Sequence, residues 1–174
     1  MLAEGYRPEE IDYVLCTHLH VDHVGWNTQL VDGEYIPTFP NASYLMGKQD
    51  LEFWSNIDQA TDVDFMKLQR TVFEECLKPI LDAGLARAVE APAPVCEGVS
   101  LIPTPGHTPG HCSVLLESNG STGLITGDFI HHPIQFHDAA LVSPFDVDNE
   151  QAIETRRKIF GEYADTPTLI IGTH

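Results

Sequence analysis

Three histidines and one aspartate are crowded into six residues near the start of the chain: His18, His20, Asp22 and His23. On an extended segment, residues two apart point to the same side, so His18 and His20 can bind one metal ion together. A turn after His20 would direct Asp22 and His23 toward a second ion. Neutral imidazole and carboxylate are preferred ligands of zinc and similar divalent cations. The segment therefore predicts a metal site, against the alternative of a histidine-rich surface turn that binds no metal.

Three later positions offer further ligands of the same chemistry. His107 lies in a stiff loop with two prolines and two glycines, Asp128 follows a glycine at the end of an apolar run, and His174 follows another apolar run. Each signal is weak alone, because an Asp after a strand commonly caps a turn. Their conjunction with the first motif makes them candidate ligands. For His111, four residues after His107, we expect a structural or orienting role and not ligation.

The elements that must position these side chains alternate between strand and helix. Asn119-Gly120 predicts a hairpin, and Asp148 is expected to cap a helix with Gln151 as its capping-box partner. Such alternation is typical of an α/β or α+β domain with helices packed on sheet. The expected strands are 11–16, 43–46, 99–102, 113–116, 123–126 and 168–171, and the expected helices are 62–83 and 148–163.

Composition narrows the class of protein. The 174 residues are 43% hydrophobic and 20% charged, which fits one globular domain, and the net charge is −17. Such a surface repels polyanions, so we expect a small-molecule substrate, no nucleic acid and no membrane partner. The first seven residues hold no apolar stretch of the secretory type, which favours a cytoplasmic protein. The four cysteines form no C-x-x-C pair, and we expect reduced, mostly buried thiols.

In their order along the chain, the four motifs resemble the metallo-β-lactamase superfamily. The motifs are His18-x-His20-x-Asp22-His23, Gly106-His107, Gly127-Asp128 and Gly172-Thr173-His174, and they span nearly the whole chain. The resemblance implies an αββα sandwich and two divalent metal ions. It also implies that His18, His20 and His107 hold one ion, that Asp22, His23 and His174 hold the second, and that Asp128 bridges the two.

The residues around the motifs favour one branch of that family. The true β-lactamases have Cys at the position of Asp128, and the diiron electron-transfer branch has Glu at that of His20. The local sequence is most similar to N-acyl homoserine lactonases and methyl-parathion-hydrolase-like enzymes. This similarity implies a metal-dependent hydrolase that uses a bridging hydroxide on an ester, lactone or phosphotriester, with Asp22 and Asp128 as catalytic residues. Zinc is the expected metal, with iron or manganese as alternatives.

Other readings stay open at this point. A glyoxalase-type thioesterase or an iron-dependent oxygenase would share the fold, and a truncated remnant would have little activity. Only 17 residues precede His18 and none follow His174, whereas family members usually have a strand-rich segment before the first motif. We therefore expect 1–174 to be a single domain that lacks the N-terminal part of the first sheet and is incomplete at both ends. An exposed sheet of this kind favours a homo-oligomer that covers it.

Overall fold

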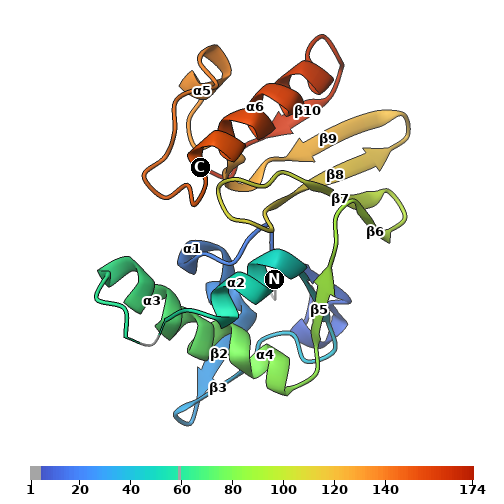
Figure 1. The fold of residues 1–174 in the computed structure, drawn as a ribbon. Helices are drawn as coiled ribbons and strands as arrows, with labels where there is room; N and C mark the ends of the chain where they lie inside the picture. The colour runs from blue at the N-terminus through green and yellow to red at the C-terminus, as the bar shows by residue number, and fades with distance from the viewer. Residues whose placement is uncertain (1–4, 59) are drawn as a thin grey trace. The chain divides into compact units, whose positions relative to one another are not determined.

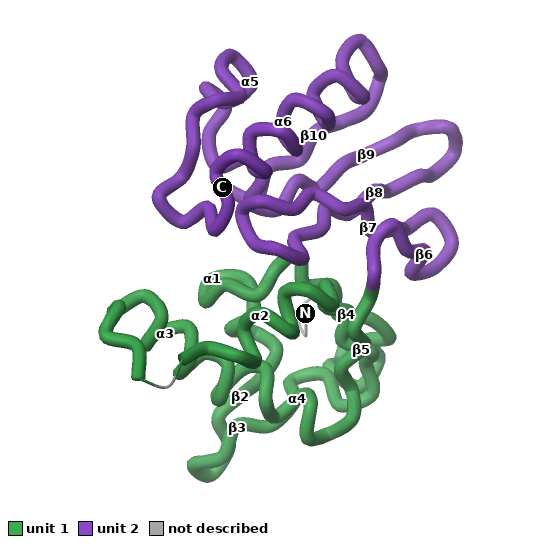
Figure 2. The backbone as a smooth tube through the Cα atoms, viewed as in Figure 1, with its two compact units in different colours: residues 1–89 green, residues 90–174 purple. Residues whose placement is uncertain are grey.

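The chain folds into two compact units, residues 1–89 and residues 90–174 (Figures 1 and 2). The computed structural model describes residues 5–58 and 60–174. Both units combine strands and helices, which confirms the mixed α/β class expected from the sequence.

Unit 1 is built on a three-stranded parallel sheet, in the order β1-β4-β5. Its core consists of buried side chains from the sheet and from the helices beside it, including Tyr44, Met46, Trp54 and Ile80. The strands are β1 (Tyr13–Leu15), β4 (Ser43–Gly47), β5 (Ala86–Val89) and the hairpin pair β2 (Thr28–Val31) and β3 (Glu34–Pro37). The helices are η2 (Pro8–Glu10), α1 (Val21–Val24), η3 (Gly25–Asn27), α2 (Lys48–Ser55), α3 (Asp64–Val72), η4 (Phe73–Leu77) and α4 (Lys78–Asp82).

The helix expected over 62–83 is present, but it changes winding in the middle. Between α3 and α4, the segment η4 forms one wide turn of π-helix. Pro79 accounts for the change, because proline has no N–H to donate and its ring clashes with the carbonyl four residues earlier. That carbonyl belongs to Glu75, and it accepts a hydrogen bond from the Thr28 hydroxyl instead (2.9 Å). The Glu75 carbonyl, which the proline leaves without its helical partner, therefore bonds the helix to the hairpin of β2 and β3.

Unit 2 is built on a five-stranded sheet in the order β10-β9-β8-β7-β6. β10 pairs in parallel with β9, and the other pairs are antiparallel. The expected hairpin turn is confirmed, since Asn119 and Gly120 both have positive φ. The elements are β6 (Ala93–Cys96), β7 (Val99–Pro103), β8 (Cys112–Ser118), β9 (Ser121–Ile125), η5 (Gly127–Phe129), α5 (Ile134–His137), α6 (Asn149–Tyr163) and β10 (Leu169–Ile171).

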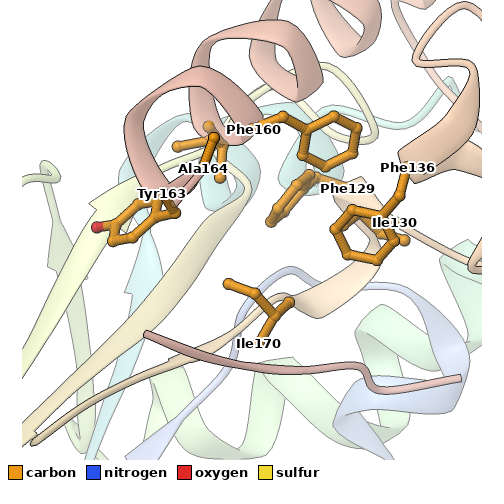
Figure 3. Close-up of a pocket in the computed structure, with 8 residues that line it drawn as sticks. Phe129, Ile130, Phe136, Phe160, Tyr163, Ala164 and Ile170 are labelled. Carbon is orange, nitrogen blue, oxygen red and sulfur yellow. The ribbon is translucent and has the colours of Figure 1, made fainter. Parts of the chain in front are cut away.

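Helix α6 packs its apolar face on this sheet. Asp148 caps the helix as expected, by accepting a hydrogen bond from the Gln151 amide (3.0 Å). The reciprocal bond of the expected capping box is replaced, because the Asp148 amide donates to the Gly106 carbonyl and not to the Gln151 side chain. Leu124 and Ile159 are buried where α6 meets the sheet. Beside them lies an apolar cavity of about 240 Å³, in which the aromatic rings of α6 and η5 face one another (Figure 3). Its lining consists of Phe129, Ile130, Phe136, Ile159, Phe160, Tyr163, Ala164 and Ile170.

Several elements were not expected from the sequence. The strands β2, β3, β5 and β6 carry mostly exposed or half-buried side chains, so they lack a strong apolar pattern.

The four cysteines form no disulfide; Cys16 and Cys112 are buried, and Cys96 is exposed. Among the described residues, no helix is long and apolar enough to cross a bilayer. Association with a second copy of the chain stays a prediction.

The loop before His107 is fitted tightly against the start of α6. Gly106 has φ +128°, and a Cβ at this position would overlap the backbone of Ala152. Its carbonyl accepts from the Asp148 amide (2.9 Å), and Thr155 Oγ1 donates to the carbonyl of Pro105 (2.5 Å). Only glycine meets both the backbone and the space requirement here.

Gly106→Ala should lower the free energy of unfolding by about 3 kcal/mol, because it adds backbone strain and an overlap with helix backbone. Gly161→Ala is the matched control, since Gly161 lies within α6 with open space around its Cα. That substitution should stabilise the chain by up to about 1 kcal/mol, the difference in helix propensity between glycine and alanine. Urea unfolding measures both; equal effects of the two substitutions would contradict the tight fit at Gly106.

Candidate metal centre

The first four candidate ligands lie together in unit 1: His18 and His20 on the segment that follows β1, and Asp22 and His23 in the short helix α1. His18 and His20 have ring centroids 4.8 Å apart, and those of His18 and His23 are 4.0 Å apart. Leu19, between the first two, is fully buried in the core of unit 1. His18 and His20 thus lie on one side of the chain and Leu19 on the other, as expected for an extended segment. His23 Nε2 lies 3.6 Å from Asp22 Oδ2, so the whole unit 1 ligand set (His18, His20, Asp22 and His23) is clustered.

Buried polar side chains hold this turn in place. The side-chain amide of Gln69, on α3, accepts from the Val21 amide (3.0 Å) and donates to the Leu19 carbonyl (3.1 Å), one on each side of His20. The Asp50 carboxylate, on α2, accepts from the Leu19 amide (3.1 Å). Backbone groups of a buried loop need such partners, since leaving them unpaired is costly. The imidazole of His20 is therefore presented on a fixed backbone.

The two ends of the unit 1 ligand set differ in exposure. His18 and His20 are buried, and Thr17 Oγ1 lies 3.1 Å from His18 Nδ1. When Nδ1 donates to that oxygen, Nε2 carries the lone pair that a metal needs. The rings of Trp54 and Phe65 pack edge-on against His20. By contrast, the Asp22 side chain is 55% exposed, which leaves this carboxylate accessible to water.

In unit 2, His107 is held by a buried carboxylate. His107 Nδ1 donates to Asp146 Oδ1 (2.9 Å), which leaves Nε2 on the side of Asp128, 3.8 Å from Oδ2. A carboxylate behind a histidine is a recurrent arrangement at metal sites, because it fixes the ring and raises its basicity. Asp146 gives no signal in the sequence, since it lies 39 residues from His107 in an irregular loop.

Asp146 is itself charge-compensated. The side chains of Asp146 and Arg156 are fully buried, and their charged atoms lie 3.7 Å apart. Burial alone would raise the pKa of Asp146, but the hydrogen bonds from His107 and from the Ser143 amide outweigh it. The charge of Arg156 acts in the same direction, so the pKa stays below its usual value. Asp146 therefore places a negative charge behind His107 at neutral pH.

Asp128 lies where β9 ends, in the short turn η5. Gly127 has φ +58°, in the left-handed region that favours glycine, and the Asp128 side chain is 4% exposed. Both carboxylate oxygens have partners: Thr173 Oγ1 donates to Oδ1 (3.0 Å), and His174 Nε2 lies 3.0 Å from Oδ2. The three candidates of unit 2 are called the unit 2 ligand set (His107, Asp128 and His174). In this set the two imidazoles lie beside the buried carboxylate of Asp128.

The orienting role expected for His111 agrees with its contacts. The Asp128 amide donates to His111 Nε2 (2.9 Å), so in the neutral ring Nδ1 carries the proton and donates to Thr104 Oγ1 (2.8 Å). Thr104 Oγ1 lies 2.9 Å from Ser113 Oγ, which donates to the Thr126 carbonyl (2.7 Å). This chain of hydrogen bonds fixes the backbone on both sides of Gly127.

The two ligand sets fit divalent metal ions. Each offers imidazole nitrogen and carboxylate oxygen, the donors that zinc and related ions take. Each is anchored by buried hydrogen bonds. The structure brings together all the sequence-predicted candidates of unit 1, and separately all those of unit 2. The supporting residues Asp50, Gln69, Asp146 and Arg156 were missed, because each comes from an element distant in the sequence.

Asp146→Asn should lower the free energy of unfolding by about 3 kcal/mol, because it leaves the buried Arg156 charge without its counter-charge. Zinc affinity should fall by about 10- to 100-fold, since His107 loses its carboxylate. The double variant Asp146→Asn/Arg156→Met removes both charges and should regain part of the lost stability without regaining zinc affinity. Urea unfolding in EDTA and zinc titration measure the two effects, with the single variant Arg156→Met included to complete the double-mutant cycle. Strict additivity of the two stability losses would contradict the pairing.

Comparison with known proteins identifies the family. The model of the metallo-beta-lactamase superfamily matches residues 1–174. N-acyl homoserine lactonase from Bacillus cereus is 28% identical over 156 residues, which are 89% of this chain and 52% of that protein. N-acyl homoserine lactonase AttM from Rhizobium radiobacter is 27% identical and covers 71% of this chain and 42% of its own length. The chain thus spans about half the length of the curated relatives it matches.

Solved structures of hydrolases are also similar to this chain. The hydrolase AbOPH of the beta-lactamase superfamily has a TM-score of 0.83 at 30% identity, over 99% of this chain and 60% of that one. A mutant of AiiA from B. thuringiensis, with N-decanoyl-L-homoserine bound at its active site, has a TM-score of 0.71 at 27% identity, over 98% and 59%. With its motifs in the family's order and the family model matched from end to end, this chain belongs to the metallo-beta-lactamase superfamily.

Proposed function

We propose that this protein is a dinuclear metal-dependent hydrolase that opens the ring of N-acyl homoserine lactones. The observation that carries the proposal is the pair of ligand sets, each of imidazole and carboxylate anchored by buried partners, in a chain whose relatives include N-acyl homoserine lactonases. The net charge of −17 agrees with a neutral substrate.

In this proposal the two ligand sets act on the same pair of ions. His18, His20 and His107 bind one ion, and Asp22, His23 and His174 bind the other. Asp128 bridges them, a role that suits a buried carboxylate with both oxygens already held in place. Seven ligands with only two carboxylates leave the centre with net positive charge. Zinc is the proposed metal, in line with its preference for nitrogen and oxygen donors.

When bound, two such ions lower the pKa of a shared water and so supply a hydroxide nucleophile near neutral pH. The chain's own groups do the rest. Asp128 fixes the spacing of the site, because its backbone is held through His111 and its oxygens through Thr173 and His174. Asp22 is the group placed to exchange protons, since its half-exposed carboxylate can take up a proton and return it to the leaving alkoxide.

Asp128→Asn tests the bridging role. The amide keeps the size of the side chain but removes a negative charge between two cations, so lactone hydrolysis should fall by a factor of about 100 or more. Asp138→Asn is the matched control, since Asp138 is exposed and its Oδ1 accepts a local hydrogen bond from the Ala140 amide. The assay is hydrolysis of an N-acyl homoserine lactone by zinc-loaded protein, with metal content measured in parallel.

Near-normal turnover of Asp128→Asn with two metals bound would contradict the bridging role. The same assay with a thioester and with a phosphotriester tests the substrate class. Two zinc ions and lactone turnover support the proposal, whereas a single iron would indicate the oxygenase of the same fold. Wild-type protein that holds two metals and hydrolyses none of these substrates would point to the remnant.

A further inference from the structure

We propose that the apolar cavity of unit 2 is a binding site for one neutral aromatic ring. The cavity lies where α6 meets the sheet, and its volume is about 240 Å³. None of its lining residues is a candidate metal ligand, so it is separate from the unit 2 ligand set. The proposal depends neither on a bound metal nor on the lactone substrate.

The size of the cavity sets the size of the ligand. Protein interiors are closely packed, and voids larger than a water molecule are few. An engineered apolar cavity of roughly 150 Å³ in another protein stays dry and binds benzene. The cavity of unit 2, at about 240 Å³, therefore has room for a six-membered ring with a short substituent.

The lining favours an aromatic ligand. The rings of Phe129, Phe136 and Phe160 lie around the open space (Figure 3). The ring centroids of Phe136 and Phe160 are 4.9 Å apart, and those of Phe129 and Phe160 are 6.4 Å apart. Aromatic pairs attract each other at such distances, so a ligand ring placed among these side chains would gain contacts that an aliphatic group would not.

The polarity of the cavity and of its surroundings requires a neutral ligand. The Tyr163 hydroxyl is the one polar side-chain group in the lining, so a charged ligand would lose its hydration without gaining partners. Burial raises the pKa of that hydroxyl, and the negative charges of Glu162 and Glu117 raise it further. A carboxylate in the cavity would meet the same two effects, which excludes an anionic ligand.

The cavity combines a buried floor with an exposed rim. Phe129 and Ile159 are buried, and the Phe129 carbonyl accepts a hydrogen bond from the buried guanidinium of Arg156 (3.2 Å). By contrast, Phe136 is 50% exposed, and Ala164 at the end of α6 is also exposed. A ligand can therefore enter at the rim and meet a floor that is already formed.

The experiment is a ¹⁹F NMR titration of the 174-residue chain with 4-fluorobenzyl alcohol, in EDTA so that no metal is bound. The dissociation constant should be about 1 mM or lower, which a ligand of about nine non-hydrogen atoms reaches at ordinary efficiency. The anion 4-fluorobenzoate has a similar shape and should bind at least about tenfold more weakly. No binding of the alcohol, or equal binding of the benzoate, would overturn the proposal.

A substitution at the rim tests the place of binding. Ala164→Leu puts a larger side chain into the cavity and should weaken binding of the alcohol at least about fivefold, because the added atoms overpack the site. Ala83→Leu is the matched control: both alanines are exposed C-cap residues, but Ala83 ends α4 in unit 1. Circular dichroism checks that both variants are folded. Equal affinities of the two variants would contradict binding in this cavity.

A substitution of a ring tests the aromatic character of the site. Phe136→Leu keeps an apolar side chain at a half-exposed position, so the fold should be retained. Loss of one aromatic contact should weaken binding of the alcohol by roughly 2- to 10-fold. Unchanged affinity would mean that the cavity selects its ligand by size alone and would make the assigned aromatic class wrong.

A further measurement needs no substitution. With labelled isoleucine methyl groups, the bound ring should give NOEs to Ile130, Ile159 and Ile170, and none to Ile80, which lies in the core of unit 1. The titration is repeated at a tenfold higher protein concentration. NOEs that miss the three lining isoleucines would overturn the proposal. An affinity that falls as the protein concentration rises would do so too, because a second copy of the chain would then occupy the cavity.

Discussion

A carboxylate buried at the end of a strand is the constraint on which the rest of unit 2 depends. Removing Asp128 from water is costly unless its charge is compensated and its oxygens are hydrogen-bonded. Thr173 and His174 contact the two oxygens, and the imidazoles of His107 and His131 lie 3.8 and 3.4 Å from Oδ2. A divalent cation bound there would complete this compensation.

The candidate ligands of both units lie in loops or short helical turns, and in both units buried polar side chains hold the backbone next to them. Gln69 bonds the backbone on the two sides of His20, and the chain from His111 to Ser113 bonds it on the two sides of Gly127. Asp146 fixes the imidazole of His107 by a hydrogen bond, and Arg156 compensates the charge of Asp146. Such preorganisation lowers the cost of ordering ligands when a metal binds.

The part of this arrangement that is local in sequence could be predicted. The spacing of His18 and His20 predicts that they share a side, Asn119-Gly120 predicts the hairpin, and Asp148 predicts the start of α6. Each of these depends on neighbours within a few residues.

The remainder depends on contacts between distant residues. Asp146 contacts His107, which lies 39 positions away in the sequence, and Gln69 contacts Val21, which lies 48 positions away. Neither has a periodic pattern or turn signal of its own, so single-sequence reasoning could not assign them. The π-helical turn is an intermediate case: Pro79 could have indicated a disturbed helix, but only the contact with Thr28 shows where the released Glu75 carbonyl bonds.

We propose that the candidate ligands of unit 1 and unit 2 bind the same pair of metal ions. The direct measurement is a crystal structure of the zinc-loaded chain with anomalous diffraction data at the zinc absorption edge. The account predicts two anomalous peaks about 3.5–4 Å apart, with His18, His20 and His107 on one ion and Asp128 between the two. Peaks bound by the ligands of one unit alone, with the histidines of the other unit on no shared ion, would contradict it.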